Sequence, residues 1–381
     1  MERAKQITII KRLLDPNRRS EIDGSVHEID VDRYTNPSRW LDEKETLFKK
    51  MPVVVGAASD LDQEGDYFLF DGLDVPIVIV KGKDCEIRAF VNRCQHRGVK
   101  LLTEEKGTIK RNIVCPYHAW TYGLDGCLKS VFHPEGFATV TADSHRLTAL
   151  DCWVRFGMIF VVADAQSRGT VLIDDWLEEV YEVTQGFDFG ALAAYRHTTG
   201  ELPFNWKLLV DGALEGYHFK IAHAKTIGPY FLDNQSVPLS NTLHSSIVFP
   251  KKSLAKLAEQ AQENWHLRKV ANVLIHLFPN AILLVEPDHI MVVSFIPKSP
   301  TVTTYKAFML LPEAPKSEEK KQYWALNEKI FWDAIDEDNE MAARQQQAFK
   351  GDTNARMSVG GFESLIIQFE ALVDHYLAEV P

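Results

Sequence analysis

The stretch Cys94-Gln95-His96-Arg97-Gly98, followed after sixteen residues by Cys115-Pro116-Tyr117-His118, decides the fold of the first half of this chain. Each half places one Cys and one His on a short loop, and Gly98 and Pro116 are typical turn residues. Two such loops at the tip of a small β domain can present two thiolates and two imidazoles to one centre. These ligands suit a [2Fe–2S] cluster, in which the imidazoles raise the reduction potential, and they also suit a structural zinc ion.

Short β-rich runs broken by turns surround these two loops, which is typical of a small sandwich or barrel. The pattern changes after about residue 165, where helical and long β-rich segments alternate, as expected of helices on an antiparallel sheet. We therefore predict an α+β protein with an N-terminal segment at 1–45, a β domain that carries the two Cys–His loops at 46–165 and a domain of helices on a sheet at 166–381. The expected short strands are Tyr67–Phe70, Val75–Val80, Ile87–Val91 and Ile109–Val114, and two long β-rich runs, Ile282–Ile296 and Thr301–Leu311, are separated by Pro297–Pro300. The expected helices are Ser38–Lys50, Asp174–Thr184, Asn205–Ile221, Ser317–Gln347 and a last one after Phe362.

Composition excludes some classes of function. The chain has 381 residues and a net charge of −11, so a nucleic-acid-binding role is not expected. No apolar run approaches the roughly 20 residues that cross a bilayer, and the first residues lack a signal-peptide core. We expect a cytoplasmic protein with reduced thiols. The three cysteines outside the two loops, Cys85, Cys127 and Cys152, are expected to be small buried apolar residues.

A second group of candidate ligands lies in the predicted domain at 166–381. His218 and His223 are candidate ligands of a mononuclear iron, because two histidines and one carboxylate leave open positions for O₂. Five residues correspond to about 140° around a regular helix, so the expected helix must end or bulge between these histidines. Glu215 precedes His218 by three residues, and we expect the two side chains to share a face.

The segment Cys115–Gly126, with the Cys-x-His-Arg-Gly loop before it, resembles the Rieske motif of ring-hydroxylating oxygenases. This resemblance implies that Cys94 and Cys115 bind the inner iron of a [2Fe–2S] cluster and that His96 and His118 bind the outer one. Respiratory Rieske proteins carry two further cysteines, joined as a disulfide, where this chain has Val99 and Tyr117. The chain is therefore similar to the oxygenase branch, over roughly residues 38–350.

The same resemblance assigns roles in the catalytic domain. It implies that Glu215 bridges an iron-binding histidine and a cluster histidine of a neighbouring subunit. Most members have Asp at this place, and Glu is shared with the branch that oxidises carnitine and glycine betaine. The acidic run from Asp336 to Glu340 resembles the stretch that supplies the carboxylate ligand, which makes Asp338 the first candidate and Asp336 the second. Gln346 then falls where the family often has Gln.

The function implied by the resemblance is that of a terminal oxygenase with one [2Fe–2S] cluster and one Fe²⁺ per subunit. A ferredoxin or flavin reductase would supply NAD(P)H-derived electrons, and O₂ would hydroxylate, dihydroxylate or dealkylate a small organic, mainly aromatic, substrate. Oxidation of a methylated or quaternary amine is the alternative. The catalytic domain would have the helix-grip fold, and the chain would form a homotrimer through head-to-tail contacts.

Two functions of other classes remain open at this point. One is an electron carrier whose C-terminal domain binds no iron, and the other is a zinc-containing binding protein. The metal content separates all three alternatives, because the oxygenase contains three irons per chain, the electron carrier contains two, and the zinc protein contains none.

Overall fold

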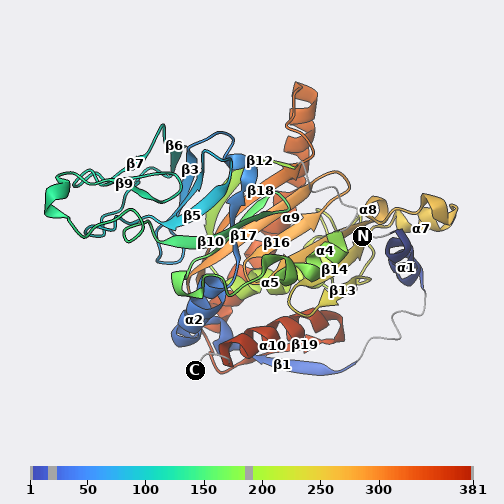
Figure 1. Ribbon diagram of the computed structural model, residues 1–381. Helices are drawn as coiled ribbons and strands as arrows, with labels where there is room; N and C mark the ends of the chain where they lie inside the picture. Colours follow the sequence, from blue (N-terminus) through green and yellow to red (C-terminus); the bar gives the residue numbers. More distant parts are fainter. Residues whose placement is uncertain (1–2, 16–23, 185–191, 379–381) are drawn as a thin grey trace. The chain divides into compact units, whose positions relative to one another are not determined.

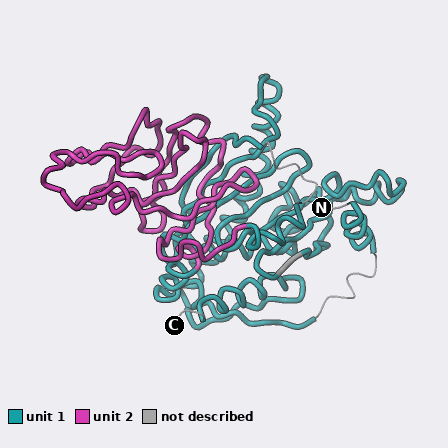
Figure 2. The backbone as a smooth tube through the Cα atoms, viewed as in Figure 1, with its two compact units in different colours: residues 1–46, 174–381 teal, residues 47–173 magenta. Residues whose placement is uncertain are grey.

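The structure, a computed structural model, describes residues 3–15, 24–184 and 192–378. The chain forms two compact units, one of residues 47–173 and one of residues 1–46 together with 174–381 (Figure 2). The domain limits predicted from the sequence, after residues 45 and 165, remain predictions. None of the helices in the described part of the chain has the length and apolar character needed to cross a lipid bilayer.

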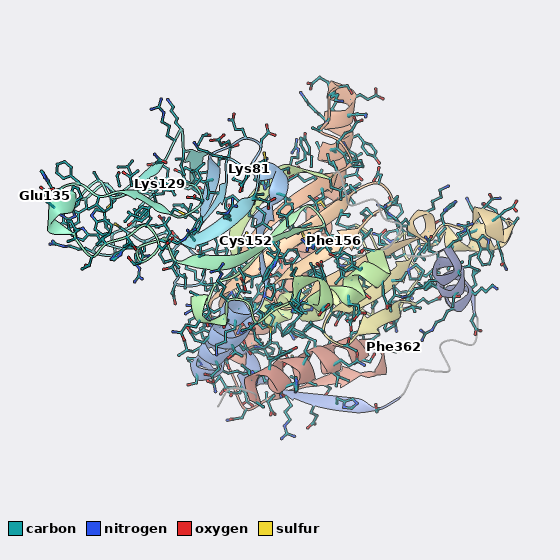
Figure 3. The ribbon with its side chains drawn as sticks, in the orientation of Figure 1. Lys81, Lys129, Glu135, Cys152, Phe156 and Phe362 are labelled. Carbon is teal, nitrogen blue, oxygen red and sulfur yellow. The ribbon has the colours of Figure 1, made fainter. Side chains whose placement is uncertain are left out.

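The unit of residues 47–173 is built from short antiparallel strands around a core that contains Trp120 and Tyr122. Seven strands form one sheet in the order β2-β11-β10-β5-β4-β3-β6, and three more form a small sheet, β7-β8-β9. Lys129 on β9 and Glu135 after it lie toward the end of the unit that carries this small sheet (Figure 3). The strands are β2 Val53–Ala57, β3 Asp66–Phe70, β4 Ile77–Lys81, β5 Ile87–Val91, β6 Lys106–Thr108, β7 Ile113–Val114, β8 Thr121–Tyr122, β9 Leu128–Ser130, β10 Ala149–Arg155 and β11 Met158–Val162.

The larger unit consists of one antiparallel sheet with helices against it (Figure 1), which confirms the predicted α+β class. Its strand order is β12-β18-β17-β16-β15-β14-β13, so six neighbouring strands in the sheet are also consecutive in the sequence. The strands are β12 Ala193–Leu202, β13 Val237–Asn241, β14 Ser245–Pro250, β15 Ala271–Leu277, β16 Ala281–Val285, β17 Ile290–Ser299 and β18 Val302–Leu311, and a separate pair is formed by β1 Val26–Asp30 and β19 Arg356–Gly360.

Helix α5 packs against both α9 and strand β17, and this packing holds the segment with the candidate histidines over the sheet. Asn205 begins α5, where its side chain accepts a hydrogen bond from the Lys207 backbone N–H at 3.0 Å. The helices are α1 Arg3–Leu14, α2 Pro37–Glu43, α3 Ile173–Trp176, α4 Glu178–Thr184, α5 Trp206–Ala213, α6 Phe219–Ala222, α7 Leu254–Ala258, α8 Leu267–Val270, α9 Glu318–Phe349 and α10 Ser364–Ala378, with a π-helical turn at Lys44–Phe48 after α2.

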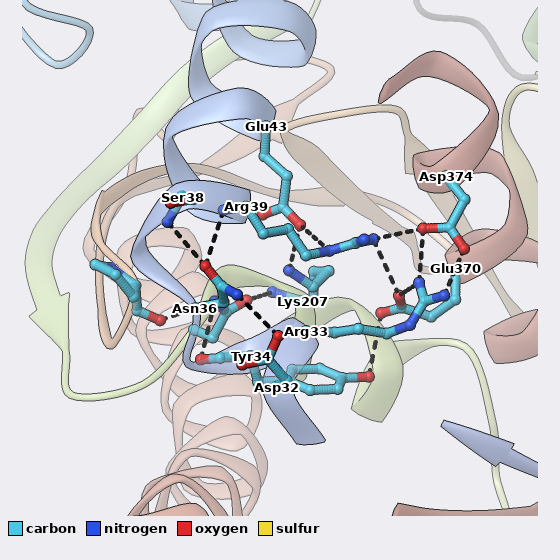
Figure 4. A network of polar contacts seen from close by, with 12 residues as sticks. Asp32, Arg33, Tyr34, Asn36, Ser38, Arg39, Glu43, Lys207, Glu370 and Asp374 are labelled. Atoms are coloured by element: carbon cyan, nitrogen blue, oxygen red, sulfur yellow. Dashed lines mark hydrogen bonds and ion pairs between the residues drawn. The ribbon is translucent and has the colours of Figure 1, made fainter. Parts of the chain in front are cut away.

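A buried ion pair fixes the start of α5 to α2 (Figure 4). Lys207 and Glu43 are both fully buried, and the Lys207 Nζ lies 2.6 Å from Glu43 Oε1. The other carboxylate oxygen, Oε2, accepts a hydrogen bond from Trp206 Nε1 at 2.9 Å, and Arg39 Nε donates to Oε1 at 3.0 Å. A buried charge is stable only where several partners surround it in this way. The Asn205-Trp206-Lys207 motif therefore acts as a cap, a core residue and an ion-pair partner.

A second group of buried polar residues connects the N-terminal segment to α10 and α5 (Figure 4). Tyr34 donates from its hydroxyl to Asp211 Oδ2 at 2.7 Å and to Glu370 Oε1 at 3.1 Å. Burial, with the nearby charge of Glu370, raises the pKa of Asp211 well above its usual range. Arg33 donates to Glu370 and to Asp374, at 2.9 and 2.8 Å. The Arg33 guanidinium lies 2.9 Å from Glu370 Oε2, so the acidic groups of this interior have a positive partner.

Three predictions of local structure were wrong. The helix expected over Asn205–Ile221 is interrupted between α5 and α6. The strand expected over Ile109–Val114 is reduced to β7, because the preceding residues leave the sheet after β6. Cys85 is exposed, because it occupies a turn with φ of 64° between β4 and β5. Cys127 and Cys152 are only partly buried, and Cys152 lies on β10 (Figure 3).

Candidate metal centres

The two Cys–His loops have the same backbone pattern. In the first, the carbonyl oxygen of Cys94 accepts a hydrogen bond from the backbone N–H of Gly98 at 2.9 Å. In the second, the carbonyl oxygen of Cys115 accepts from Ala119 at 3.0 Å, again four residues later. Gly98 and Ala119 both have positive φ, of 78° and 55°, which an alanine adopts only at an energetic cost. The two loops are therefore equivalent turns that each present one Cys and one His.

The four candidate cluster ligands lie together inside these turns. Cys94 and Cys115 are each 2% exposed, and their thiols are close enough to interact. The imidazole rings of His96 and His118 lie 4.7 Å apart between centroids. Their Nδ1 atoms are buried, and neither has a hydrogen-bond partner in the described part of the chain. Burial lowers the pKa of His96, with a smaller effect of His118.

Two buried thiols and two buried, unpartnered imidazole nitrogens fit the donor set of a Rieske-type [2Fe–2S] cluster. Buried polar atoms normally have partners, so two buried Nδ1 atoms without one are in the position expected of metal ligands. Trp120 stacks on the His96 ring, with centroids 4.9 Å apart and planes 5° apart. This stacking holds the imidazole in its orientation.

The second constellation lies where α5 gives way to α6. Helix α5 ends at Ala213, and His218 and His223 stand immediately before and after the four residues of α6. The break between α5 and α6 precedes His218, and α6 itself ends at Ala222, between the two histidines, as expected. This arrangement turns both rings toward one point, with the two Nε2 atoms 3.2 Å apart.

Asp338 on α9 completes this group. Its Oδ1 lies 3.4 Å from His218 Nε2 and 3.1 Å from His223 Nε2, so three ligand atoms lie within 4.8 Å of one another. Three ligands at about 2.1 Å from one metal, at right angles, would be about 3 Å apart. The separations in the structure therefore fit the facial arrangement of a mononuclear iron site.

The side chains of the acidic run on α9 point in different directions. Asp336 is exposed, and its charge raises the pKa of Tyr305 after the larger effect of burial. Two residues correspond to about 200° around a helix, so Asp336 points away from the side that carries Asp338. Gln346, two turns later, is 1% exposed and accepts a hydrogen bond from the backbone of Asn205 at 2.7 Å. This contact joins α9 to the start of α5.

Each of the two histidines has a carboxylate on its other ring nitrogen. His218 Nδ1 contacts Glu215, and His223 Nδ1 lies 2.9 Å from Glu337 Oε2. Thr226 also donates to Glu337, at 2.5 Å. Carboxylates in this position fix the tautomer and the orientation of a metal-binding imidazole. A carboxylate beside each Nδ1 favours the tautomer with its proton on Nδ1, which leaves the Nε2 lone pair for a metal.

The charges of these groups follow from their partners. Burial opposes protonation of His223, but Asp338 and Glu337 outweigh it and raise the pKa of the imidazole. Partial burial acts against ionisation of Glu337, and the hydrogen bonds from Thr226 and His223 outweigh it and lower its pKa. The two carboxylates around His223 therefore favour a positive charge at this site. A divalent metal would supply that charge.

Glu215 lies in the interruption between α5 and α6, so the shared helix face predicted for it and His218 does not exist. Its carboxylate instead accepts hydrogen bonds from the backbone N–H groups of Tyr217 and His218, the latter at 3.2 Å. Glu215 is 7% exposed. Burial raises the pKa of the neighbouring Glu363, and the charge of Glu215 adds to this effect. Glu215 therefore shapes the backbone before His218 as well as orienting its ring.

A cavity of about 770 Å³ opens beside the candidate iron ligands. His218, His223 and Asp338 line it together with apolar side chains of the sheet, such as Leu284 and Met291. Cavities of about 300–1,000 Å³ with apolar walls and a few polar groups are typical of small-molecule sites. The candidate metal centre therefore faces a space large enough for a small organic substrate.

Comparison with known families identifies both halves of the chain. Residues 189–379, half of the chain, match the family "Ring hydroxylating alpha subunit (catalytic domain)". The chain belongs to this family. Residues 51–141 match the "Rieske [2Fe-2S] domain". The resemblance inferred from the sequence is thereby confirmed. In this family the Rieske domain binds a [2Fe–2S] cluster and the catalytic domain binds a mononuclear Fe²⁺.

Two relatives of this chain are named for carnitine and for glycine betaine. The carnitine monooxygenase oxygenase subunit of Escherichia coli (strain K12) is 34% identical over 60% of this chain and 59% of its own length. The glycine betaine monooxygenase oxygenase subunit of Chromohalobacter salexigens is 27% identical over 64% of this chain and 53% of its own length. The matched region thus spans little more than half of either relative.

Solved structures show the same fold. A quaternary ammonium Rieske monooxygenase superposes with a TM-score of 0.79 at 23% identity, over 95% of this chain and 98% of the other. Naphthalene 1,2-dioxygenase from Rhodococcus sp. superposes with a TM-score of 0.75 at 16% identity, over the whole of both chains. The predicted helix-grip fold of the catalytic domain is therefore shared by a quaternary ammonium monooxygenase and by a naphthalene dioxygenase.

Sequence reasoning missed Glu337 and Thr226 in this site. Glu337 was seen only as a member of an acidic run, in which most side chains face water. Its position directly before Asp338 offered a signal, because adjacent residues on a helix lie about 100° apart and can contact two sides of one metal site. Thr226 carried no signal, because its contact with Glu337 joins residues 111 positions apart.

Proposed function

We propose that this protein is the terminal oxygenase of a multicomponent Rieske non-haem iron system. The observation that supports this most is the convergence of His218, His223 and Asp338 beside a substrate-sized cavity. The same chain carries a Rieske domain. Such a combination serves an enzyme that receives electrons one at a time and uses O₂ on an organic substrate.

The metal ligands are assigned as follows. Cys94 and Cys115 hold one iron of the cluster, and His96 and His118 hold the other through their unpartnered Nδ1 atoms. His218, His223 and Asp338 hold Fe²⁺. When bound, the cluster supplies one-electron transfer, and the mononuclear iron supplies O₂ activation.

The protein's own side chains prepare this site. Glu215 and Glu337 each hold one imidazole by its Nδ1, so that both Nε2 lone pairs face the metal position. We assign Glu215 a second role, a link between His218 and a cluster histidine of a neighbouring subunit. The apolar cavity wall keeps water away from the reacting carbon, and the polar residues at its edge orient the substrate.

Two substrate classes fit this function, and the second has the stronger support. The first is an aromatic ring that is hydroxylated or dihydroxylated. The second is a methylated or quaternary amine that is oxidised or dealkylated, in line with the names of the carnitine and glycine betaine relatives. Glu at position 215, which departs from the more common Asp, also favours the amine class.

The assembly and the partners follow from the same proposal. A ferredoxin or flavin reductase delivers electrons from NAD(P)H, and the chain forms a cytoplasmic homotrimer in which neighbouring subunits contribute to each electron path. The domain division at 1–45, 46–165 and 166–381 belongs to this proposal as well.

Metal analysis and oxygen uptake together test the function. The purified protein is expected to contain three irons per chain and, when reduced, to give the EPR signal of a Rieske cluster. With a generic reductase it is expected to consume O₂ in the presence of an aromatic acid or a methylated amine. Two irons per chain would instead indicate an electron carrier, and zinc without iron would indicate a zinc protein.

A further inference from the structure

The floor of the cavity is one face of the sheet, and its polar residues gather at one end. Side chains two apart on a strand share a face, and the cavity residues follow this spacing on β15 and β16. Leu274 and Leu284 are paired across these strands, and Leu284 is paired with Met291 on β17. This row forms the apolar middle of the floor.

The polar end of the floor comprises Lys251, Asn272, Glu286 and His289, which all line the cavity. Lys251 follows the end of β14 and Glu286 follows the end of β16, while Asn272 lies near the start of β15 and His289 directly before β17. Because neighbouring strands are antiparallel, these four positions meet at the same end of the strands. We call these four residues the polar end.

The contacts within the polar end leave two groups available to a ligand, Asn272 Oδ1 and Lys251 Nζ. Asn272 Nδ2 donates to Glu286 Oε1 at 2.6 Å, which fixes the orientation of the amide. Asn272 is 5% exposed, and its Oδ1 is buried without a hydrogen-bond partner in the described part of the chain. Lys251 Nζ lies 3.5 Å from Glu286 Oε2, a long contact for an ammonium that has three donors.

The balance of charges decides which ligand fits. Glu286 already accepts from Asn272 and faces Lys251, and Arg268 Nε donates to the Glu286 backbone oxygen at 2.8 Å. The remaining acid, Asp288, is engaged by His289 at 2.9 Å and by Tyr323 at 2.5 Å. The unused capacity therefore lies with the donors of Lys251, which repel a cation and attract an anion.

We propose that the substrate carries a carboxylate, which pairs with Lys251 at the polar end while the oxidised group lies at His218, His223 and Asp338. A hydroxyl or N–H near the carboxylate would donate to Asn272 Oδ1, which otherwise stays buried without a donor. This inference rests on the proposed function and narrows its substrate class. It selects organic acids, including zwitterionic amino acids and betaines, over hydrocarbons and simple amines.

The test measures binding to the iron-loaded protein without O₂, by isothermal titration calorimetry. The probes are L-carnitine and its methyl ester, and benzoate and methyl benzoate, so that each acid has a partner without the charge. At least one acid is expected to bind about 10-fold or more tightly than its ester, the usual effect of one charge-assisted hydrogen bond. Equal binding within both pairs, or no binding of either acid, would overturn the proposal.

Variants assign the effect to the polar end. Lys251→Met is expected to abolish the preference for the acid, while Lys251→Arg retains most of it. Lys252→Met is the matched control, because Lys252 is exposed on the next position, and the preference is expected to be unchanged. An acid preference that survives Lys251→Met would place the carboxylate elsewhere and refute the assignment.

Glu286→Gln gives a second test, in which the direction of the change in affinity for the acid decides. Removing this negative charge is expected to tighten binding of the acid several-fold, whereas a cation held by Glu286 would bind more weakly. Weaker binding of the acid would overturn the proposal even if Lys251→Met does not fold. Failure of the proposed function is distinguishable, because an acid would then bind through Lys251 without any substrate-dependent O₂ uptake.

Discussion

The Nδ1 atom of His223 lies 2.9 Å from Oε2 of Glu337, the residue that directly precedes Asp338 on α9. The Nε2 atom of the same ring lies 3.1 Å from Asp338 Oδ1. One turn of α9 thus supplies both a candidate metal ligand and the carboxylate that orients another ligand. The iron site and the helix are therefore coupled, because a rotation of α9 would disturb both contacts together.

Glu337→Gln tests this coupling. The amide keeps an acceptor for Thr226 but loses the charge that holds the Nδ1 proton of His223, so iron affinity is expected to fall about 10-fold or more. Iron content after dialysis against a chelator measures this. Glu340→Gln is the matched control, because Glu340 is an exposed acid of the same helix that contacts Arg344. Equal iron retention by both variants would show that Glu337 does not support the metal.

Asp338→Asn and Asp336→Asn distinguish the two candidate carboxylate ligands. Asp338→Asn is expected to lower the iron content from three to two per chain, because an amide is a poor ligand for iron. The EPR signal of the reduced cluster is expected to remain. Asp336→Asn is expected to retain three irons, since its side chain is exposed away from the histidines. The reverse result would move the ligand to Asp336.

Much of the fold was predictable from local patterns. Antiparallel strands such as β5 and β18 coincide with the predicted runs at Ile87–Val91 and Thr301–Leu311, because alternation and turn residues mark their limits. Helix α9 at Glu318–Phe349 likewise agrees with the charged segment that was expected to be helical. These elements depend on neighbours in the sequence.

The site was predictable only in its residue types. Spacing indicated that His218 and His223 could not share a regular helix face, but not where the helix stops. The interruption depends on Glu215, whose carboxylate accepts backbone hydrogen bonds from Tyr217 and His218. Contacts between distant segments, such as Thr226 with Glu337, have no counterpart in a local pattern.

Lys207→Met tests how the site is supported from the far side of α5. It removes one of the two ion-pair partners of the fully buried Glu43, which keeps Arg39, and is expected to cost up to about 3–5 kcal/mol of stability. The double variant Glu43→Gln with Lys207→Met is expected to recover a large part of this loss. Thermal unfolding followed by calorimetry measures it. Lys220→Met, at an exposed pair with Asp233, is the control and is expected to change stability by less than about 1 kcal/mol.

The ion pairs of Asp374 lead us to expect that the stability of the protein depends on pH. Partial burial opposes its ionisation, but the hydrogen bonds and charges of Arg33 and Arg39 outweigh it and hold the pKa below its ordinary value of 3.8. A carboxyl group whose pKa is lowered by folding stabilises the protein above its unfolded pKa, and this contribution is lost as the pH falls through the folded pKa. Asp374→Asn is therefore expected to lower the unfolding temperature near neutral pH.

The difference between Asp374→Asn and the unmodified protein is expected to shrink below about pH 4, where the carboxyl of the unfolded chain begins to be protonated, and to vanish once the pH falls below the lower native pKa. Calorimetric scans at several pH values from neutral to acid measure this difference. A gap that stays constant over the whole range would show that Asp374 acts through packing instead of charge.

Glu215 carries the last prediction, because it combines two roles that mutation can separate. Glu215→Gln keeps an acceptor for the backbone N–H groups of Tyr217 and His218 but removes the negative charge toward His218 Nδ1. Three irons per chain and a reducible cluster are expected to remain, while product formation falls about 10- to 100-fold, as for other lost orienting carboxylates. Glu215→Ala is expected to be at least as slow.

Single-turnover measurements locate the defect. With the cluster reduced beforehand, the rate of its reoxidation by O₂ and substrate is expected to fall in parallel with product formation in both variants. A structural role alone would lower iron content or thermal stability in Glu215→Ala without slowing reoxidation in the fraction that retains iron. Unchanged reoxidation in Glu215→Gln would remove this residue from the connection between the two metal centres and leave it only its contacts with the backbone.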